Sequence, residues 1–289
     1  MKTVVMTGGT AGFGAVAAKR IFDTPNTRLI LGARDNQNSS IETVPLDLAC
    51  LSNVRSFVQS LTKKLDGTKI DGLIMNAGAQ FGNTKHRTDD GFESTFAINH
   101  LAHYLLLRLL TPSLAKNATI VITTSDVHDP KMVPFGPKEL DPEALAHPKA
   151  KGKGFMPGIK AYASSKLCDL LTARAFEVST EAQINGMRII AYNPGLTPGT
   201  SLFRAWPRWA KLMMAVASRL RPVNTIEQAG NAIADLGLGT IVAPSGRIYA
   251  SLVKGKLTWP DPSELAQSDA AMRGLWVESA HMVGLPGQA

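Results

Sequence analysis

Residues 3–22 read "TVVMTGGTAGFGAVAAKRIF", and the architecture of the chain can be worked out from this motif. A short apolar run comes first, then a turn with Gly8, Gly12 and Gly14, then helix-forming residues. Glycines let the backbone turn tightly and approach an anion, whose charge the amides and dipole of the following helix stabilise. The order predicts a strand, a phosphate-binding turn and a helix, although the spacing is G-x-x-x-G-x-G rather than G-x-G-x-x-G. The alternative is that these glycines serve only as turn residues.

The same alternation continues along the chain, where β-rich apolar runs are separated by helical patterns. Apolar strands without polar alternation indicate a parallel sheet that is buried on both faces. We therefore expect a single α/β domain over residues 1–289, a Rossmann-like doubly wound parallel sheet with helices on both faces. Ligands bind such sheets at the carboxyl ends of the strands. The expected strands include residues 3–6, 28–32, 72–75, 119–123, 188–192 and 247–250.

Two stretches interrupt this rhythm. Residues 126–158 are rich in Pro, Gly and Lys and predict a long insertion. Residues 201–222 interleave aromatic and apolar side chains with Arg and Lys. We interpret residues 197–222 as a substrate lid. The alternative is a basic amphipathic segment that attaches to an anionic membrane surface.

Composition and charge exclude several classes of protein. Hydrophobic residues make up 44% of the 289 residues and charged residues 19%, which is typical of a globular chain and not of a disordered one. The net charge of +8 suits an anionic ligand, but an excess of lysine is usual on a solvated surface, so no nucleic-acid partner is predicted. Cys50 and Cys168 are far apart without metal-ligand spacing, so neither a disulfide framework nor a metal site is expected.

The chain carries no sign of export or membrane insertion. Its first residues, "MKTVVMTGG", enter a strand pattern at once and leave no room for a signal segment. The longest apolar run, "YLLLRLL" at residues 104–110, is far shorter than the roughly 20 residues that a bilayer span requires. We expect a cytoplasmic protein without a transmembrane helix.

The end of the second expected strand, "LGARD", bears on the choice of dinucleotide. Arg34 stands where an NAD enzyme places an acid for the ribose 2′-hydroxyl. A planar guanidinium suits a 2′-phosphate, so NADP(H) is predicted in preference to NAD(H). Two alternatives remain, because Asp35 follows directly and would serve the ribose, and Arg34 would also suit a loop salt bridge.

A tyrosine and a lysine are four residues apart in "AYASSK" at residues 161–166. A helix places Tyr162 and Lys166 on one face. A free tyrosine has a pKa of about 10, and a nearby ammonium together with a positive nicotinamide favours the phenolate. We predict that Tyr162 is a general acid in carbonyl reduction and a base in the reverse direction. The alternative is an ordinary pair of residues on a helix surface.

Seven short motifs in a fixed order resemble the short-chain dehydrogenase/reductase family over nearly the whole chain. They are "TGGTAGFG" at residues 7–14, "DL" at 47–48, "NAG" at 76–78, "INH" around Asn99, Ser125, Tyr162 with Lys166, and "NPG" at 193–195. The resemblance implies a catalytic tetrad of Asn99, Ser125, Tyr162 and Lys166. Ser125 would donate a hydrogen bond to the substrate oxygen, and Asn99 would hold a water for a proton relay.

The resemblance also implies how a dinucleotide is held. Asp47 would contact the adenine, Asn76 would support the sheet beside the cofactor, and Lys166 would reach the nicotinamide ribose. The full set of expected cofactor-binding residues is Thr7, Gly8, Thr10, Gly12, Phe13, Gly14, Arg34, Asp47, Leu48, Asn76, Ala77, Gly78, Tyr162, Lys166, Pro194, Gly195 and Thr197.

Within the family, one branch is the most similar. Ser125 and Tyr162 are further apart than is usual, and "DGFESTFAINHLAHYLL" and "YASSKLCDLL" resemble the branch of retinol dehydrogenases and light-dependent protochlorophyllide reductase. Cys168 matches a cysteine found there, but we interpret it as a small buried hydrophobe. Leu196 stands where the chlorophyll enzyme has a second cysteine, which indicates a relative rather than the photoenzyme.

The expected function is an NADP(H)-dependent oxidoreductase that acts on a bulky apolar carbonyl compound or its alcohol. Two alternatives are a C=C reductase similar to protochlorophyllide reductase and a non-catalytic dinucleotide-binding sensor. The resemblance implies a homodimer or homotetramer. Apolar side chains of the two irregular stretches would form the substrate wall: Phe135, Phe155, Met156, Phe203, Trp206, Trp209, Met213 and Met214.

Overall fold

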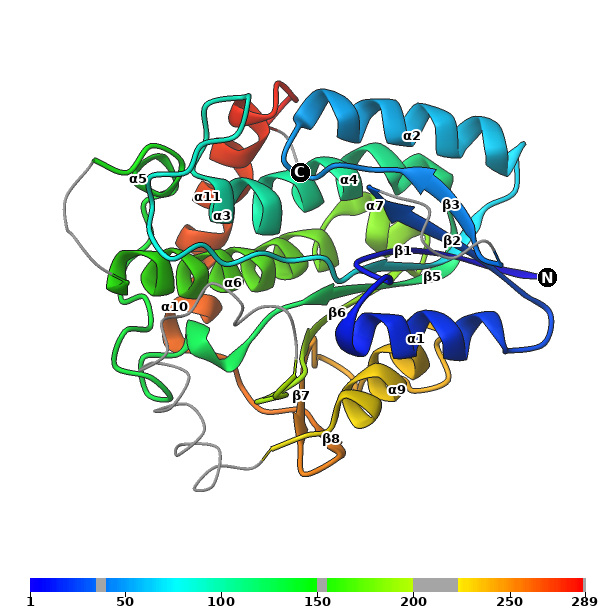
Figure 1. Ribbon diagram of the computed structural model, residues 1–289. Helices are drawn as coiled ribbons and strands as arrows, with labels where there is room; N and C mark the ends of the chain where they lie inside the picture. The colour runs from blue at the N-terminus through cyan, green and yellow to red at the C-terminus, as the bar shows by residue number, and fades with distance from the viewer. Residues whose placement is uncertain (35–39, 150–154, 200–222, 288–289) are drawn as a thin grey trace.

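The chain is built around one twisted sheet with helices on both faces (Figure 1). A computed structural model describes residues 1–34, 40–149, 155–199 and 223–287. Within these residues, eight strands are ordered β3-β2-β1-β4-β5-β6-β7-β8. All neighbouring pairs are parallel except β7 and β8, which are antiparallel. The strands are β1 (Lys2–Thr7), β2 (Thr27–Ala33), β3 (Glu42–Pro45), β4 (Ile70–Met75), β5 (Leu114–Thr123), β6 (Arg188–Asn193), β7 (Tyr249–Val253) and β8 (Lys256–Thr258).

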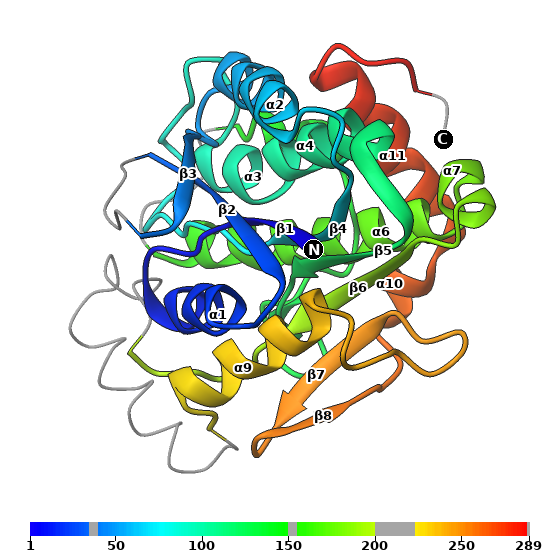
Figure 2. The ribbon, with the colours of Figure 1, turned by 90° about the vertical axis from the view of Figure 1, so that its right-hand side faces the viewer.

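Two groups of helices cover the sheet. On one face lie α2 (Leu51–Leu65), α4 (Ala102–Leu110), α6 (Met156–Glu177) and α11 (Asp269–Met282), and on the other lie α1 (Gly12–Phe22) and α9 (Ile226–Gly237) (Figures 1 and 2). The predicted doubly wound fold is therefore confirmed. The short helical elements are α3 (Ser94–Phe96), η1 (Ala97–Leu101), η2 (Thr111–Ser113), η3 (Asp126–His128), α5 (Pro142–Ala146), α7 (Thr180–Ile184) and α10 (Glu264–Gln267).

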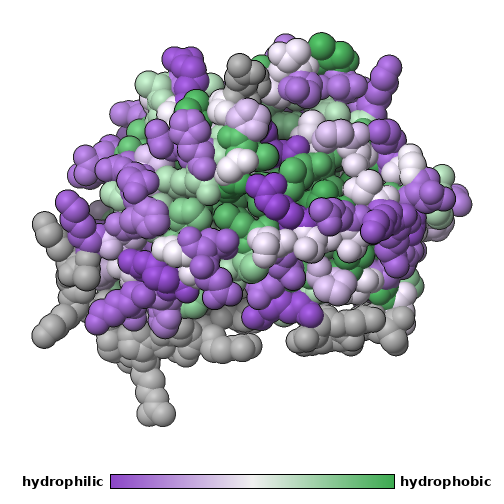
Figure 3. Space-filling model, turned by 90° about the horizontal axis from the view of Figure 1, so that it is seen from above, coloured by the Kyte–Doolittle hydropathy of each residue, from purple (hydrophilic) through white to green (hydrophobic). Residues whose placement is uncertain are grey.

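The central strands are largely apolar because they contribute to two cores. Val5 on β1 packs in the core below α2, α4, α6 and α11, whereas Val4 and Met6 pack in the core against α1 and α9. Burial on both faces removes the need for polar residues at alternate positions. The outer surfaces of the helices remain mostly hydrophilic, with some hydrophobic side chains gathered in the middle of the face seen in Figure 3.

The two edge strands were not predicted. β3 has four residues, of which only Val44 is buried, and the three residues of β8 are all at least partly exposed. Such short, half-exposed strands carry little hydrophobic pattern, which is the main signal for a strand in a sequence. The strand predicted at residues 247–250 begins later in the structure, because β7 starts at Tyr249.

The structure describes most of the predicted insertion but only the first residues of the predicted lid. Part of the predicted insertion forms η3 and α5, and α6 already begins at Met156, so residues 156–158 belong to that helix. The predicted lid lies outside the described residues from position 200 onward. The apolar run at residues 104–110 is buried in α4 beneath the other helices. Among the described helices, none combines the length and apolarity needed to cross a bilayer.

Close packing of the backbone holds the first turn against the sheet. Gly8 has a φ of +69°, and a Cβ there would lie 2.6 Å from the backbone nitrogen of Ala77. A Cβ at Gly14 would clash with the carbonyl oxygen of Gly8 and lie 2.7 Å from Nδ2 of Asn76. Glycine is therefore required at both positions for the start of α1 to approach the ends of β1 and β4.

We predict opposite effects for two glycine-to-alanine changes in helices. Gly14→Ala should lower the free energy of unfolding by about 2 kcal/mol, since overpacking forces backbone shifts. Gly274→Ala in α11 is the control, because, apart from its chain neighbours and the backbone of its own helix, no described residue comes within 4 Å of its Cβ position. It should leave stability unchanged or raise it by about 0.5–1 kcal/mol. Urea unfolding measures both, and equal effects at the two positions would contradict the packing argument.

Candidate active site

A cavity of about 1860 Å³ opens at the carboxyl ends of the central strands. It is lined by the glycine turn after β1, the ends of β2, β4 and β5, the middle of α6 and the segment after β6. Of the predicted site residues, Thr7 and Asn99 are absent from its lining, and the others border it. The fold thus brings together residues that are spread over most of the sequence.

The strand ends beneath the cavity are joined by the side chains of Asn76 and Thr7. Asn76 Nδ2 donates to the carbonyl oxygen of Gly8 at 3.0 Å, and its Oδ1 accepts from Thr123 Oγ1 at 2.9 Å. The Thr7 hydroxyl accepts the backbone N–H groups of Asn76 and Ala77, each at 3.1 Å. These bonds connect β1, β4 and β5, so Asn76 supports the sheet at the cavity floor.

His103 completes this network and was not predicted from the sequence. Its Nδ1 donates to the carbonyl oxygen of Asn99 at 2.9 Å, since a carbonyl only accepts, so Nε2 accepts from the Thr7 hydroxyl at 3.1 Å. The Thr7 hydroxyl then uses its proton and both lone pairs. Burial lowers the pKa of His103 to about 4, so the ring is neutral. The sequence shows this histidine only as a polar residue in an apolar helix.

Asn99 lies behind the cavity wall, in the π-helical turn η1 that joins α3 and α4. Its Oδ1 accepts from the backbone nitrogen of Ala79 at 2.7 Å, while Nδ2 donates to the carbonyl oxygen of Ala79 at 3.0 Å and to Ser165 Oγ at 2.9 Å. The helix is distorted at Asn99, since residues Ala97–Leu101 form a π-helical turn. Its side chain connects the segment after β4 to α6.

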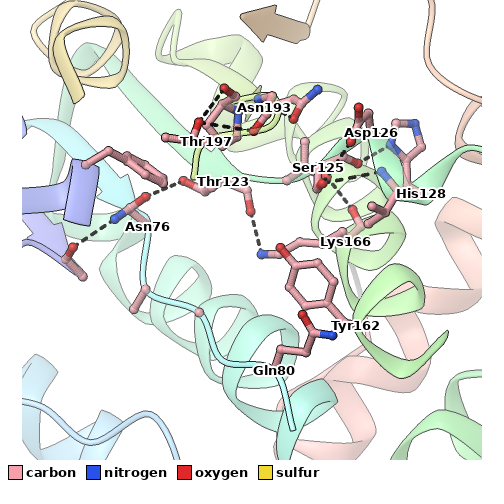
Figure 4. A pocket seen from close by; sticks show the side chains of 18 of the residues that line it. Asn76, Gln80, Thr123, Ser125, Asp126, His128, Tyr162, Lys166, Asn193 and Thr197 are labelled. Carbon is pink, nitrogen blue, oxygen red and sulfur yellow. Dashed lines mark hydrogen bonds between the residues drawn. The ribbon is translucent and has the colours of Figure 1, made fainter. Parts of the chain in front are cut away.

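Tyr162 and Lys166 are adjacent on α6, facing the cavity (Figure 4). The Lys166 ammonium lies 5.8 Å from the centre of the Tyr162 ring. It donates to the carbonyl oxygen of Thr123 at 2.8 Å and to Oδ2 of Asp169 at 2.8 Å. Asp169 was missed in the sequence, although its position three residues after Lys166 places it on the same side of the helix.

The pKa of Tyr162 differs from the sequence-based expectation. Burial raises this pKa above its ordinary value, and the nearby carboxylates of Asp169 and Asp126 raise it further. The expectation concerned Lys166 together with a bound nicotinamide, and in the protein without its cofactor the pKa is raised instead. The main physical reason is burial of the phenol, and the nearby ammonium is itself paired with the buried carboxylate of Asp169.

Ser125 follows β5 and caps the short helix η3 at the cavity. Its Oγ lies 3.3 Å from Oδ1 of Asp126, to which it donates (Figure 4). His128 holds this turn, because its Nδ1 donates to the carbonyl oxygen of Ser125 at 2.7 Å and its Nε2 accepts from the Ser263 backbone at 3.3 Å. Burial lowers the pKa of His128, in agreement with this neutral tautomer.

The apolar wall is only partly the predicted one. Phe135 lines the cavity, whereas Phe155 and Met156 are absent from its lining and Met156 is 48% exposed. The predicted residues Phe203, Trp206, Trp209, Met213 and Met214 lie outside the described part of the chain, as does Asp35. Apolar lining residues that were not predicted include Phe81, Val133, Pro134, Ile159 and Tyr249.

Gln80 is a further lining residue that sequence reasoning missed. It is 8% exposed and lies beside Tyr162 in Figure 4. Among the described residues, neither polar atom of its side chain has a hydrogen-bond partner. Its position directly after "NAGA" was the available signal.

Cys168 behaves as predicted. It is fully buried in the core on the α2, α4, α6 and α11 side, and burial raises the pKa of its thiol well above the ordinary value. A thiol with a raised pKa is a poor nucleophile, so the packing role is the appropriate one.

The residues at the cavity fit a dinucleotide. The glycine turn and the first residues of α1 border the cavity, where the amides of a helix N-terminus suit a phosphate. Arg34 and Asp47 border the same cavity at the ends of β2 and β3, where the adenosine half would lie. Lys166 and Tyr162 border its other half.

Comparison with known proteins agrees with this geometry. A family model described as short chain dehydrogenase matches residues 2–134. The WW domain-containing oxidoreductase of Danio rerio is 30% identical over 98% of this chain and 68% of its own length. The oxidoreductase calI of Penicillium decumbens is 32% identical over 71% of this chain, and the match spans 61% of that relative's length. Protochlorophyllide reductase A of Oryza sativa subsp. japonica is 27% identical over 98% of this chain and 80% of its own length.

Among solved structures, an uncharacterised protein from Mycobacterium Paratuberculosis is similar over 100% of this chain and 96% of its own, with a TM-score of 0.73. Its sequence identity of 24% supports the fold alone. The family follows from the sequence matches, the motif order and the sheet. The chain belongs to the short-chain dehydrogenase/reductase family.

Proposed function

We propose that the protein is an NADP(H)-dependent oxidoreductase that interconverts a carbonyl compound and its alcohol. The observation that carries the proposal is the meeting of Ser125, Tyr162 and Lys166 in one cavity with the glycine turn. A protein that only senses a dinucleotide has no need of a proton donor there. The arrangement therefore favours catalysis over a purely binding role.

In the proposed reaction each residue acts on the substrate oxygen or on a proton. Bound NADPH supplies a hydride, which the carbonyl carbon accepts. Ser125 Oγ donates a hydrogen bond to the carbonyl oxygen and stabilises the charge that develops on it. Tyr162 transfers its proton to that oxygen, which completes the alcohol, and the phenolate later takes a proton back from solvent.

The electrostatics of the free protein keep Tyr162 in its protonated form. Its pKa is raised by burial and by the carboxylates of Asp169 and Asp126, so the phenol keeps its proton at neutral pH. In the direction of alcohol oxidation, Tyr162 must first lose this proton. The sign of the shift therefore predicts oxidation that accelerates as pH rises, and reduction that slows at alkaline pH.

Arg34 supports a preference for NADP(H). It is exposed at the end of β2 and borders the cavity. A guanidinium there binds a 2′-phosphate through charge-assisted hydrogen bonds that a 2′-hydroxyl does not offer.

The substrate that we propose is bulky and largely apolar. Phe81, Val133, Phe135 and Ile159 line the same cavity as Tyr162 and Ser125. Such side chains suit a lipophilic ligand held by few polar contacts. NADPH oxidation with aromatic ketones and retinoid-like aldehydes tests this, and faster turnover of small sugars or hydroxy acids would reject it.

The similarity to protochlorophyllide reductase supports a second candidate function, the reduction of a conjugated C=C bond in a tetrapyrrole-like compound. The same proton donor would then serve a ring carbon instead of a carbonyl oxygen. Light-dependent turnover of protochlorophyllide distinguishes this candidate from the first.

Replacement of Tyr162 tests the proposed acid. Tyr162→Phe removes the hydroxyl but keeps the ring, so turnover should fall by roughly 10² or more while NADPH affinity is retained. Tyr104→Phe is the control, because its hydroxyl donates to the carbonyl oxygen of Trp276 in the core. Steady-state kinetics and calorimetric titration measure the two effects. Turnover close to that of the parent protein would refute the role of Tyr162.

Replacement of Arg34 tests the cofactor preference. Arg34→Ala should raise KM for NADPH by about tenfold or more and leave KM for NADH nearly unchanged, because one charge-assisted contact is lost. Arg28→Ala on β2, the strand that precedes Arg34, is the control, since Arg28 pairs with Glu42 at 2.8 Å and does not border the cavity. An equal loss for both cofactors would mean that Arg34 does not discriminate between them.

A further inference from the structure

Gln80 has a buried side-chain amide that the proposed reaction does not use. The residue is 8% exposed, and among the described residues neither its Nε2 nor its Oε1 has a hydrogen-bond partner. Of the described side chains that border the cavity, it is the only one with buried polar atoms left unpaired in this way. A buried amide without a partner lowers the stability of the fold, and an apolar side chain of the same size would avoid this penalty. The unpaired amide therefore indicates a ligand.

The backbone on both sides of Gln80 is fixed by neighbouring elements. The Ala79 N–H donates to Asn99 Oδ1 at 2.7 Å, and Asn99 Nδ2 donates to the Ala79 carbonyl oxygen at 3.0 Å. On the other side, α6 packs closely at Gly158, where a Cβ would lie 2.2 Å from the carbonyl oxygen of Phe81. These contacts anchor the segment after β4 to η1 and to α6. Gln80 is therefore held on a rigid support, which a specific binding site requires.

The side chain of Gln80 lies in the part of the cavity that contains Tyr162. Figure 4 shows it extending from the segment after β4 toward the Tyr162 ring. Apolar residues such as Phe81 and Ile159 line the same cavity. In a pocket with apolar walls, a few polar groups fix the orientation of the ligand. The last torsion of a glutamine side chain has broad energy minima, so the amide can turn to meet a ligand in the cavity.

We propose that the Gln80 amide binds a second, uncharged polar group of the substrate and thereby orients the reacting carbonyl toward Tyr162 and Ser125. The inference deepens the proposed function and rests on it for the reaction at that carbonyl. The binding step does not depend on turnover, so it is measurable separately.

The chemistry of the amide defines the substrate class. Its nitrogen donates two hydrogen bonds and its oxygen accepts two. The amide carries no charge to balance an ionised group, whereas a hydroxyl or a further carbonyl pairs with it directly. The substrate class is therefore a largely apolar carbonyl compound that carries one more hydroxyl or carbonyl group. A ligand without that group leaves the amide unpaired and binds more weakly.

Thermal unfolding of the free protein tests the unpaired state of the amide. Gln80→Met keeps the approximate size of the side chain but removes the amide, so the unfolding midpoint should rise by roughly 2–4 °C. Gln59→Met is the matched control, because Gln59 is exposed on α2, and it should leave the midpoint unchanged. Scanning calorimetry measures both. An unchanged or lowered midpoint in Gln80→Met would mean that the amide stabilises the free protein, and the proposal would be overturned.

Steady-state kinetics with a matched set of ketones tests the role in binding. The probes are acetophenone and its ortho-, meta- and para-hydroxy derivatives, with NADPH as the reductant. For at least one hydroxy derivative, kcat/KM relative to acetophenone should be about tenfold or more higher in the parent protein than in Gln80→Met. Comparing the same two ketones in both proteins cancels their intrinsic reactivity. Gln59→Met should keep the ratio of the parent protein, and equal ratios in the parent protein and Gln80→Met for every derivative would contradict the proposal.

Binding measurements separate this proposal from the proposed function. Calorimetric titration of the same ketones into protein saturated with NADP⁺, which cannot reduce them, gives their affinity alone. The same tenfold ratio in affinity without any turnover would support Gln80 and count against the proposed function. Turnover with an unchanged ratio would do the opposite. Weaker binding of NADP⁺ in Gln80→Met with an unchanged ketone ratio would assign the amide to the cofactor and overturn the proposal, and a lack of ketone binding to the parent protein would overturn both.

Discussion

Hydrogen bonds of the Thr7 hydroxyl and the Asn76 side-chain amide connect the carboxyl ends of the central parallel strands. The cavity lies at these strand ends, so its geometry depends on this connection. Thr7 ends β1 and accepts two backbone N–H groups that follow β4, while Asn76 reaches both the glycine turn and Thr123 on β5. Parallel strands end at one edge of the sheet and leave backbone groups unpaired there. Side chains that form hydrogen bonds with those groups hold the glycine turn, the floor and the wall of the cavity in fixed positions relative to one another.

The residues of the site fall into two groups. One group lines the cavity, and the other lies behind the cavity wall and supports it. Ser125, Tyr162 and Lys166 belong to the lining. Asn99 and His103 belong to the support, because their polar atoms bond to protein groups within the wall. The π-helical turn at Asn99 matters here, since it allows this side chain to bond the segment after β4 and Ser165 at once.

Electrostatics near Tyr162 depend on burial more than on proximity to a cation. Lys166 lies close to the phenol, yet its charge is offset by Asp169 at 2.8 Å. Desolvation then becomes the largest influence on the phenol and raises its pKa. The phenol of the free protein is therefore protonated, and a bound cofactor would add its own charge to this balance.

The sequence by itself determined the doubly wound sheet, the glycine turn and the spacing of Tyr162 and Lys166, because these are local patterns with local physical causes. Gly14 and its neighbours are recognisable from their order between a strand and a helix, and a separation of four residues places two side chains on one helix face. Edge strands such as β8 were not recognisable, since three partly exposed residues are too few to show a repeating pattern of hydrophobic positions. Only the tertiary structure decided that Asp169 is buried against Lys166 and that His103 reaches Thr7. Burial and pairing of charges depend on which elements pack together, and a sequence pattern does not contain that information.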